Sequence, residues 1–182
     1  MYGKVINIPL FAGFGKRLNK IMNKLNSFKV PSHSMTIKTE VVCPNDTNPM
    51  GILQGGRLVE WMDIAAAVCA QTHAGKICVT ASINQVDFNA AARVGDIITI
   101  HACITRAFNT SMEIFVHAFA RQVTAGKKYL ISEAYFTFVA LDENGKAAVV
   151  IAVKPVTALE NKQYSEALKR KTKRNIIKKN KA

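Results

Sequence analysis

The stretch Asn48–Ala70, NPMGILQGGRLVEWMDIAAAVCA, decides the fold. Gly55 and Gly56 open a run without Pro or further Gly until Gly75, and apolar side chains cover most of its helical circumference. Because a helix that is apolar nearly all round belongs inside a protein, we expect a buried central helix here. The run also carries Asp63 between two apolar residues. A carboxylate inside a protein needs a partner or a use, so Asp63 is the first candidate functional residue.

Strand-like segments lie on both sides of this helix. Before it, residues 35–42 alternate with period two and lead into the turn-rich stretch CPNDTNPMG at 43–51. After it, apolar runs at 77–88, 97–107, 112–123 and 129–141 are separated by turn residues, and a short run at 147–153 ends before Pro155. One long apolar helix followed by an antiparallel meander predicts an α+β fold whose sheet wraps the helix.

The basic residues are concentrated at the two ends of the chain. The formal charge is +13, but residues 1–39 hold seven Lys/Arg and no acid, and residues 162–182 hold nine against one. Residues 40–161 therefore carry a net charge of −2. This balance excludes a nucleic-acid-binding surface on the globular body. The sequence contains neither a P-loop nor a GxGxxG dinucleotide fingerprint.

We divide the chain into three parts. Residues 1–34 form a basic leader. We favour a disordered segment, or upstream sequence ahead of a true start at Met22 or Met35, over an amphipathic helix that touches an anionic membrane or a partner. Residues 35–155 form the domain, and residues 156–182 form a basic C-terminal helix or tail that opens with a capping box, Thr157 to Glu160. The four Cys lack metal-ligand spacing and indicate a reduced, cytoplasmic compartment. The four His show no spacing for a triad or a metal site, so we interpret them as structural.

Several sequence blocks together resemble one known family. They are the NPxGxxxGG turn at 48–56, the helix with Met62-Asp63, and VTASINQVDF (79–88), VGD (94–96), NTSMEI (109–114) and YLISEAYFTFVALDENGK (129–146). From about Met35 to Val153, the chain resembles the acyl-CoA thioesterases of the hotdog fold, chiefly the bacterial short-chain and animal cytosolic long-chain forms.

The resemblance implies a five- or six-stranded antiparallel sheet around one central helix. It implies paired subunits with active sites at their boundary, assembled further as a trimer of dimers, which makes a homohexamer. It also implies an enzyme of fatty acid metabolism that hydrolyses acyl-CoA. CoA is then part of the substrate, no metal or other cofactor takes part, and no nucleic acid is required.

Hydrolysis of a thioester needs oxyanion donors and a carboxylate that attacks or activates water. A helix N-terminus offers free N–H groups and partial positive charge, so Gly55 and Gly56 are the predicted donors. Asp63 is the predicted base or nucleophile, and Asn48 is predicted to hold the water or the thioester oxygen. Each of these assignments has a structural alternative. The Gly pair only turns the chain into the helix, Asp63 lies at the edge of a polar stripe with Glu60, and Asn48 is a turn residue.

Two positions near the Gly pair depart from the family pattern. Gln54 stands where many hotdog enzymes have His, and an amide there positions substrate but cannot act as a base. Ile52 stands where the bacterial short-chain form has Asp and one repeat of the animal enzyme has Asn. Either Asp63 alone carries the chemistry, or the chain is a slow or non-catalytic acyl-CoA binder.

Contacts with CoA are predicted from residue type, because phosphates bind Arg, Lys and backbone donors. The candidates are Arg93, Arg106, Asn109, Thr110 and Ser111, with Ser82 and Asn84 lining the pocket from a neighbouring strand. The leading hypothesis is thus an acyl-CoA hydrolase, and the second is a regulatory protein of the same fold that binds acyl-CoA without turnover. A third places the function in the basic tails, which would dock on RNA or an anionic membrane.

Overall fold

The central helix, α2, runs from Gly55 to Ala74 and ends where its sequence predicts. Gly75 follows in the left-handed region, with a φ of 62°, and its N–H donates to the carbonyl of Gln71 over 2.8 Å. Glycine adopts this conformation without steric cost, which makes it the usual helix terminator. The computed structural model describes residues 28–179.

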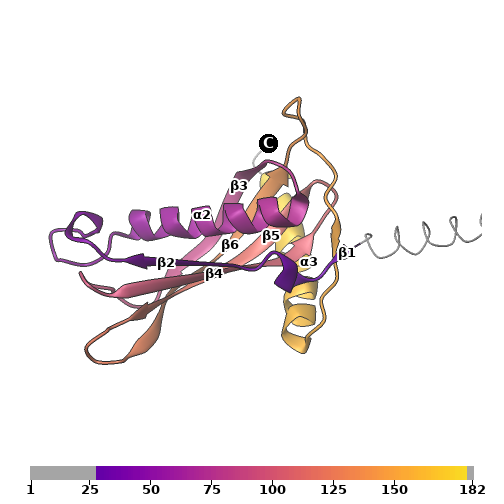
Figure 1. The fold of residues 1–182 in the computed structure, drawn as a ribbon. Coiled ribbons are helices and arrows are strands. Elements are labelled where there is room, and N and C mark those ends of the chain that lie inside the picture. The colour runs from indigo at the N-terminus through magenta and orange to yellow at the C-terminus, as the bar shows by residue number, and fades with distance from the viewer. Residues whose placement is uncertain (1–27, 180–182) are drawn as a thin grey trace, which may run out of the picture.

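A five-stranded antiparallel sheet wraps around α2, which confirms the predicted α+β architecture (Figure 1). The strands are β2 (Thr36–Val41), β3 (Cys78–Phe88), β4 (Ile97–Ala107), β5 (Ser111–Arg121) and β6 (Lys128–Ala140), in the spatial order β2-β4-β5-β6-β3. The apolar run expected at 147–153 contributes only β7 (Ala152–Val153), which pairs in parallel with β1 (Phe28–Lys29) outside the main sheet.

The hydrophobic core lies between α2 and the concave face of the sheet. Leu58, Trp61, Met62, Ala65 and Cys69 are buried on the helix. Alternate residues of the central strands are buried against them, as period-two side-chain alternation requires. The other side of α2 is not covered by residues 28–179. Packing within one chain therefore buries only part of the apolar surface of this helix.

A β-bulge in β3 changes which side chains face the helix. Thr80 is paired with the buried Phe138, whereas Ser82 is paired with Thr137, and the register shifts between them. In a regular strand, residues 80 and 82 would share one face. The bulge instead places Thr80 on the concave face and Ser82 on the convex face.

The C-terminal helix, α3 (Ala158–Lys179), lies against the convex face, on the opposite side of the sheet from α2 (Figure 1). The predicted capping box is confirmed: Glu160 N–H donates to the Thr157 hydroxyl, and Glu160 Oε2 accepts from the N–H of Val156 and Thr157. Burial raises the pKa of Glu160, but these hydrogen bonds outweigh it and hold that pKa below its ordinary value.

The last turn of α2 is held by a residue from the range that we assigned to the leader. The Lys29 ammonium donates to the carbonyls of Thr72 and His73 over 3.2 and 2.7 Å, where the helix dipole favours a cation. His73 is itself fully buried, and its Nε2 donates to the carbonyl of Ile151 over 3.0 Å. Residues 28–34 are therefore attached to the domain, and the rest of the expected leader, residues 1–27, lies outside the described residues.

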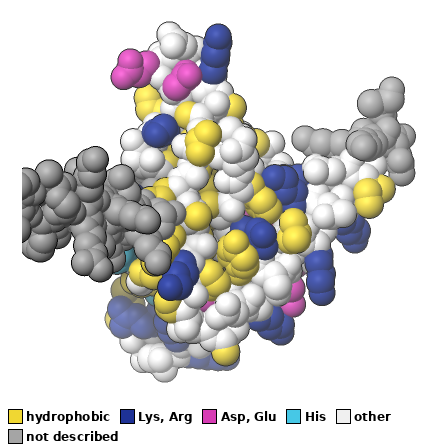
Figure 2. Space-filling view, turned by 90° about the vertical axis from the view of Figure 1, so that its right-hand side faces the viewer, with side chains coloured by type: hydrophobic (Ala, Val, Ile, Leu, Met, Phe, Trp, Pro, Cys, Tyr) yellow, Lys and Arg dark blue, Asp and Glu magenta, His cyan; other side chains and the backbone are white. Residues whose placement is uncertain are grey.

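The surface at the end of the molecule that carries β1 and α3 is mixed in character. Figure 2 shows Lys and Arg side chains scattered across this face, singly or in small groups, among apolar and uncharged ones. Within residues 28–179, no helix combines the length and the apolar composition needed to cross a bilayer.

Candidate active site

The loop before α2 is held in shape by Asn48. Its Oδ1 accepts from the N–H groups of Met50 and Ile52 at 3.0 and 3.2 Å, and its own N–H donates to the carbonyl of Ile52. The side chain of Gln54 donates to the carbonyl of Thr47 over 2.9 Å. Both predicted site residues thus shape the loop, and the hydrogen bonds among residues 28–179 leave Asn48 Nδ2 available to a ligand.

The N-terminus of α2 presents backbone donors beside a cavity. The first intrahelical bond is the one from Leu58 N–H to the carbonyl of Gln54, and no acceptor within the described chain binds the N–H of Gly55 or Gly56. A cavity of about 380 Å³ opens beside Gly55 and is lined mainly by apolar residues of the loop 88–92 and of α2. A Cβ on Gly55 would lie 3.1 Å from Phe88 Cζ, whereas one on Gly56 would meet nothing within 4 Å.

Asp63 lies farther along α2 and is held by a residue that we did not predict. The Thr80 hydroxyl donates to Asp63 Oδ1 over 2.8 Å. This donor is neutral. Because Asp63 is only half-buried, its carboxylate also remains open on one side. A charge-assisted hydrogen bond of this kind fixes the carboxylate while leaving Oδ2 free to act.

The glycine amides and the carboxylate of one chain are too far apart to act on one carbonyl group. Asp63 is eight residues beyond Gly55, which is about 12 Å along the axis at about 1.5 Å per residue. Nor does Asp63 line the cavity beside Gly55. Our expectation that both lie on the wall of a single pocket is therefore not met within one chain.

The uncovered side of α2 and the edge strand β3 form an apolar surface next to Asp63. Ile64 and Val68 on α2 are 44% and 46% exposed, and Ile83 at the centre of β3 is 38% exposed. β3 is the sheet edge on this side, with eleven residues and no strand beyond it in the described part of the chain. An edge strand of this length presents unpaired N–H and C=O groups, which form a template for pairing with another chain.

The predicted CoA contacts fall in three separate places. Arg93 is exposed and lies opposite Ile52 in an isolated bridge, near the loop before α2. Asn109 and Thr110 lie in the β4–β5 turn, and Ser111 begins β5. The N–H groups of Ala140 and Val150 donate to the carbonyls of Thr110 and Asn109, respectively.

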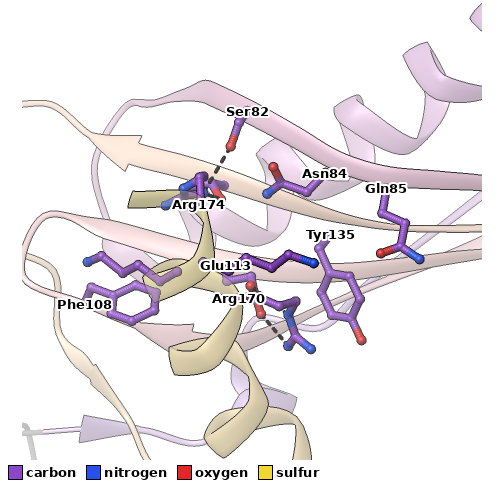
Figure 3. A pocket seen from close by; sticks show the side chains of 11 residues that line it. Ser82, Asn84, Gln85, Phe108, Glu113, Tyr135, Arg170 and Arg174 are labelled. Carbon is purple, nitrogen blue, oxygen red and sulfur yellow. Dashed lines mark hydrogen bonds and ion pairs between the residues drawn. The ribbon is translucent and has the colours of Figure 1, made fainter. Parts of the chain in front are cut away.

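The other three predicted contacts lie on the convex face, away from Asp63. Arg106 donates to the carbonyl of Tyr164 over 3.0 Å, and its guanidinium stacks on the Tyr164 ring. Ser82 accepts from Arg174 over 3.1 Å, and Ser82 and Asn84 line a pocket under α3 (Figure 3). The bulge in β3 accounts for this position.

Two of the cysteines and one of the histidines have pKa values that burial shifts strongly. Burial raises the pKa of Cys69 to about 12 and that of Cys103 to about 11, so both thiols stay protonated at neutral pH. Burial, then the neighbouring His101 and Lys128, lower the pKa of His117 to about 4. These values favour neutral side chains at physiological pH.

Comparison with known proteins identifies the family. The model of the thioesterase superfamily matches residues 50–127. The chain is 35% identical to the uncharacterized acyl-CoA thioester hydrolase YkhA of Bacillus subtilis (strain 168), over 78% of this chain and 82% of that one. The fold and this match define a hotdog-type thioesterase domain. The chain belongs to the thioesterase superfamily, as the sequence blocks predicted.

Solved structures agree with this assignment. The crystal structure of an apo-hexameric acyl-CoA thioesterase has a TM-score of 0.80 and 38% identity, over 82% of this chain and 96% of that one. An acyl-CoA hydrolase from Staphylococcus aureus, solved with butyryl-CoA, CoA and CoA disulfide, has a TM-score of 0.78 and 36% identity, over 85% and 96%. By contrast, the chain spans only about a fifth of the mouse acetyl-coenzyme A thioesterase, at 41% identity over 57% of this chain.

Variants of the Staphylococcus aureus hydrolase bear on the site. Three have been solved with alanine in place of an asparagine, an aspartate and a threonine, where the asparagine precedes the aspartate by 15 residues and the threonine follows it by 17. Asn48, Asp63 and Thr80 have the same spacing and the same residue types. From the sequence we selected Ser82 and Asn84 but not Thr80, although period-two alternation places all three on one face. Only the bulge, which the sequence does not show, puts Thr80 alone beside Asp63.

Proposed function

We propose that this protein is an acyl-CoA thioesterase that hydrolyses fatty acyl-CoA to a free fatty acid and CoA. The observation that carries the proposal is the hydrogen bond between Thr80 and Asp63, together with the spacing of Asn48, Asp63 and Thr80 that the Staphylococcus aureus hydrolase shares. The named relatives are acyl-CoA thioesterases and thioester hydrolases, which supports the same substrate class. CoA is part of the substrate, and the reaction needs no metal or other cofactor.

Asp63 acts as general base or nucleophile in this scheme. Thr80 orients the carboxylate through Oδ1, so that Oδ2 faces the water or the acyl carbon. Asn48 contributes its free Nδ2 to the water or the thioester oxygen. Since Ile52 supplies no polar group, Asp63 is the one carboxylate in this arrangement.

The oxyanion is stabilised by the N–H groups of Gly55 and Gly56 from a second copy of the chain. Their N–H groups have no acceptor within the described chain, and they add to the positive end of the α2 dipole. Two copies paired through their β3 edges in antiparallel fashion would also run their α2 helices antiparallel. The N-terminus of one helix then lies alongside the body of the other, where Asp63 is located. Loss of one such donor typically costs about 2.7–4 kcal/mol of barrier.

Three of these dimers form a homohexamer in the proposal, which the hexameric state of the apo relative supports. The exposed apolar residues of β3 and α2 become the dimer boundary. Arg93 beside the loop, and the turn Asn109 to Ser111, remain the proposed contacts for CoA phosphates. A cytoplasmic location is proposed from the free cysteines and from the cytosolic acyl-CoA thioester hydrolases among the relatives.

Thiol release tests the proposal across a series of acyl-CoA chain lengths. Wild type should release CoA, and Asp63→Asn should lose at least about a hundredfold in kcat while its affinity for acyl-CoA changes little. Glu60→Gln is the matched control, because Glu60 is an exposed carboxylate on the same helix, paired with Arg57. If wild type binds acyl-CoA but releases no thiol at any chain length, the non-catalytic binding protein is the correct alternative.

A further inference from the structure

A second pocket lies on the convex face, between the sheet and the last turns of α3. It has a volume of about 440 Å³. Ser82, Asn84 and Gln85 of β3 form one wall, and Arg170, Lys171 and Arg174 of α3 form another (Figure 3). The sheet separates this pocket from Asp63 and α2, so it is not part of the proposed active site.

Among the described residues, the only carboxylate that lines the pocket is already neutralised. Glu113 is 4% exposed, and its two oxygens accept from Arg170 Nη2 and Nε over 2.7 and 3.1 Å. The Thr105 hydroxyl donates a further hydrogen bond to the same carboxylate over 2.7 Å. The pair of Glu113 and Arg170 therefore contributes no net charge to the pocket.

The remaining cations have only neutral partners among the residues that line the pocket. Arg174 Nη1 donates to the hydroxyls of Ser82, over 3.1 Å, and of Thr137, and neither carries charge. Lys171 Nζ lies over the Phe108 ring at 3.8 Å. Burial and then the nearby Arg174 and Arg106 lower the pKa of Lys171. Several positive groups are thus held close together without a negative counterpart in the described lining.

A solvated basic helix would turn these side chains outward, where water screens them. Here Arg170 and Arg174 instead point onto the sheet, as Figure 3 shows. The uncharged amides of Asn84 and Gln85 lie beside them and offer further donors. An anion bound between Lys171 and Arg174 would relieve their mutual repulsion.

We propose that this pocket is a second, non-catalytic binding site for a ligand that carries phosphate groups. Guanidinium and ammonium groups at close range are the usual partners of phosphate, and the guanidinium can bind two of its oxygens at once. The volume admits more than one phosphate group, and Phe108 and Tyr135 line it for an apolar part of the ligand. Phospholipid headgroups and soluble phosphate compounds share this chemistry.

Calorimetric titration of the full chain with inorganic pyrophosphate tests the site. Wild type should bind one equivalent per chain, and Arg174→Gln and Lys171→Gln should each weaken binding by about tenfold or more, since each removes a charge-assisted contact. Lys169→Gln is the matched control, because Lys169 is exposed on the same helix and does not line the pocket. Thermal unfolding of each variant checks that α3 stays docked, and Lys171→Gln leaves both the Arg174 contacts and the pair of Glu113 and Arg170 in place.

A parallel assay distinguishes the two sources of phosphate. If the ligand is a lipid headgroup, the protein should co-sediment with phosphatidylglycerol vesicles, and pyrophosphate should release it from them. Pyrophosphate binding without vesicle capture assigns the pocket to a soluble compound. The site is refuted if neither probe binds, or if Lys169→Gln weakens binding as much as Arg174→Gln does. Neither readout depends on thioester hydrolysis, so failure here would leave the proposed function untouched.

Discussion

The Thr80 hydroxyl donates a hydrogen bond to Asp63 Oδ1 over 2.8 Å, from an edge strand to the helix that the strand flanks. The bulge between Thr80 and Ser82 turns this hydroxyl toward the helix. One carboxylate oxygen is thereby fixed, and the other is left for chemistry. The relationship links a local irregularity of the backbone to the group that we propose as base or nucleophile.

Removal of the Thr80 hydroxyl should impair catalysis without unfolding the protein. Thr80→Val keeps the size and β-branching of the side chain but removes the donor to Asp63. A hydrogen bond to a charged group is worth about 1.5–3 kcal/mol, so kcat should fall by about ten- to a hundredfold. Thr80→Ser retains the hydroxyl and should stay within a few-fold of wild type. Equal loss in both variants would argue against an orienting hydrogen bond.

Removal of one N–H at the start of α2 should lower kcat at nearly constant stability. Gly56→Pro deletes a proposed oxyanion donor, and proline is tolerated in the first helical turn. The expected loss in kcat is about 10²–10³. Gly56→Ala is the control, because its N–H remains and its Cβ meets no atom within 4 Å. Full activity in Gly56→Pro would remove this amide from the mechanism.

A charge at the centre of β3 should dissociate the proposed dimer. Ile83→Lys places an ammonium on the exposed apolar edge, where a second copy would have to bury it. Sedimentation velocity should show monomers, and thiol release should fall with the oligomer. Val149→Lys is the matched control, since Val149 is 67% exposed and outside every strand of the described chain. A variant at position 83 that stays assembled and active would place the dimer boundary elsewhere.

Stability should fall as the solution is acidified below neutral pH. His117 has a folded pKa of about 4, below its ordinary value, because of burial and the neighbouring His101 and Lys128. Between about pH 6.5 and about pH 4, the unfolded chain binds a proton that the folded chain does not, so the free energy of unfolding decreases as pH falls. The lowered pKa values of His73 and His101 act in the same direction.

Urea unfolding across this pH range measures the effect. His117→Gln should flatten the dependence of the free energy of unfolding on pH, because the variant lacks a group whose folded pKa is lowered to about 4. The stacked ring of His101, 5.2 Å away, stays in place in this variant. An unchanged slope in His117→Gln would show that other groups dominate acid unfolding.

Much of the fold was predictable because it follows from local patterns. The run from Gly55 to Gly75 carries its own start and stop signals, and the turn residues separate the strands at regular intervals. The capping box at Thr157 was likewise predictable from four consecutive residues. These features depend on neighbours in sequence, which a single chain displays directly.

What could not be predicted depends on contacts between distant residues. The bulge in β3 moved Ser82 and Asn84 to the convex face and left Thr80 beside Asp63, although a period-two pattern treats all three alike. The sequence predicts a basic helix or tail from residue 156, but nothing in it indicates that Arg170 and Arg174 bind partners on the sheet. The sequence predicts a buried carboxylate at Asp63, but one chain covers it only in part. We propose that a second subunit covers the rest.

Mixing two inactive variants tests the shared site most directly. Asp63→Asn removes the carboxylate and Gly56→Pro removes one glycine N–H. In a complete site of the proposal, these two groups come from different chains. After the variants are unfolded together and refolded, random pairing in a two-fold dimer leaves about a quarter of all sites intact. Thiol release should therefore recover to about a quarter of the wild-type rate, and no recovery in the mixture would contradict an active site built by Asp63 of one chain and the glycine amides of another.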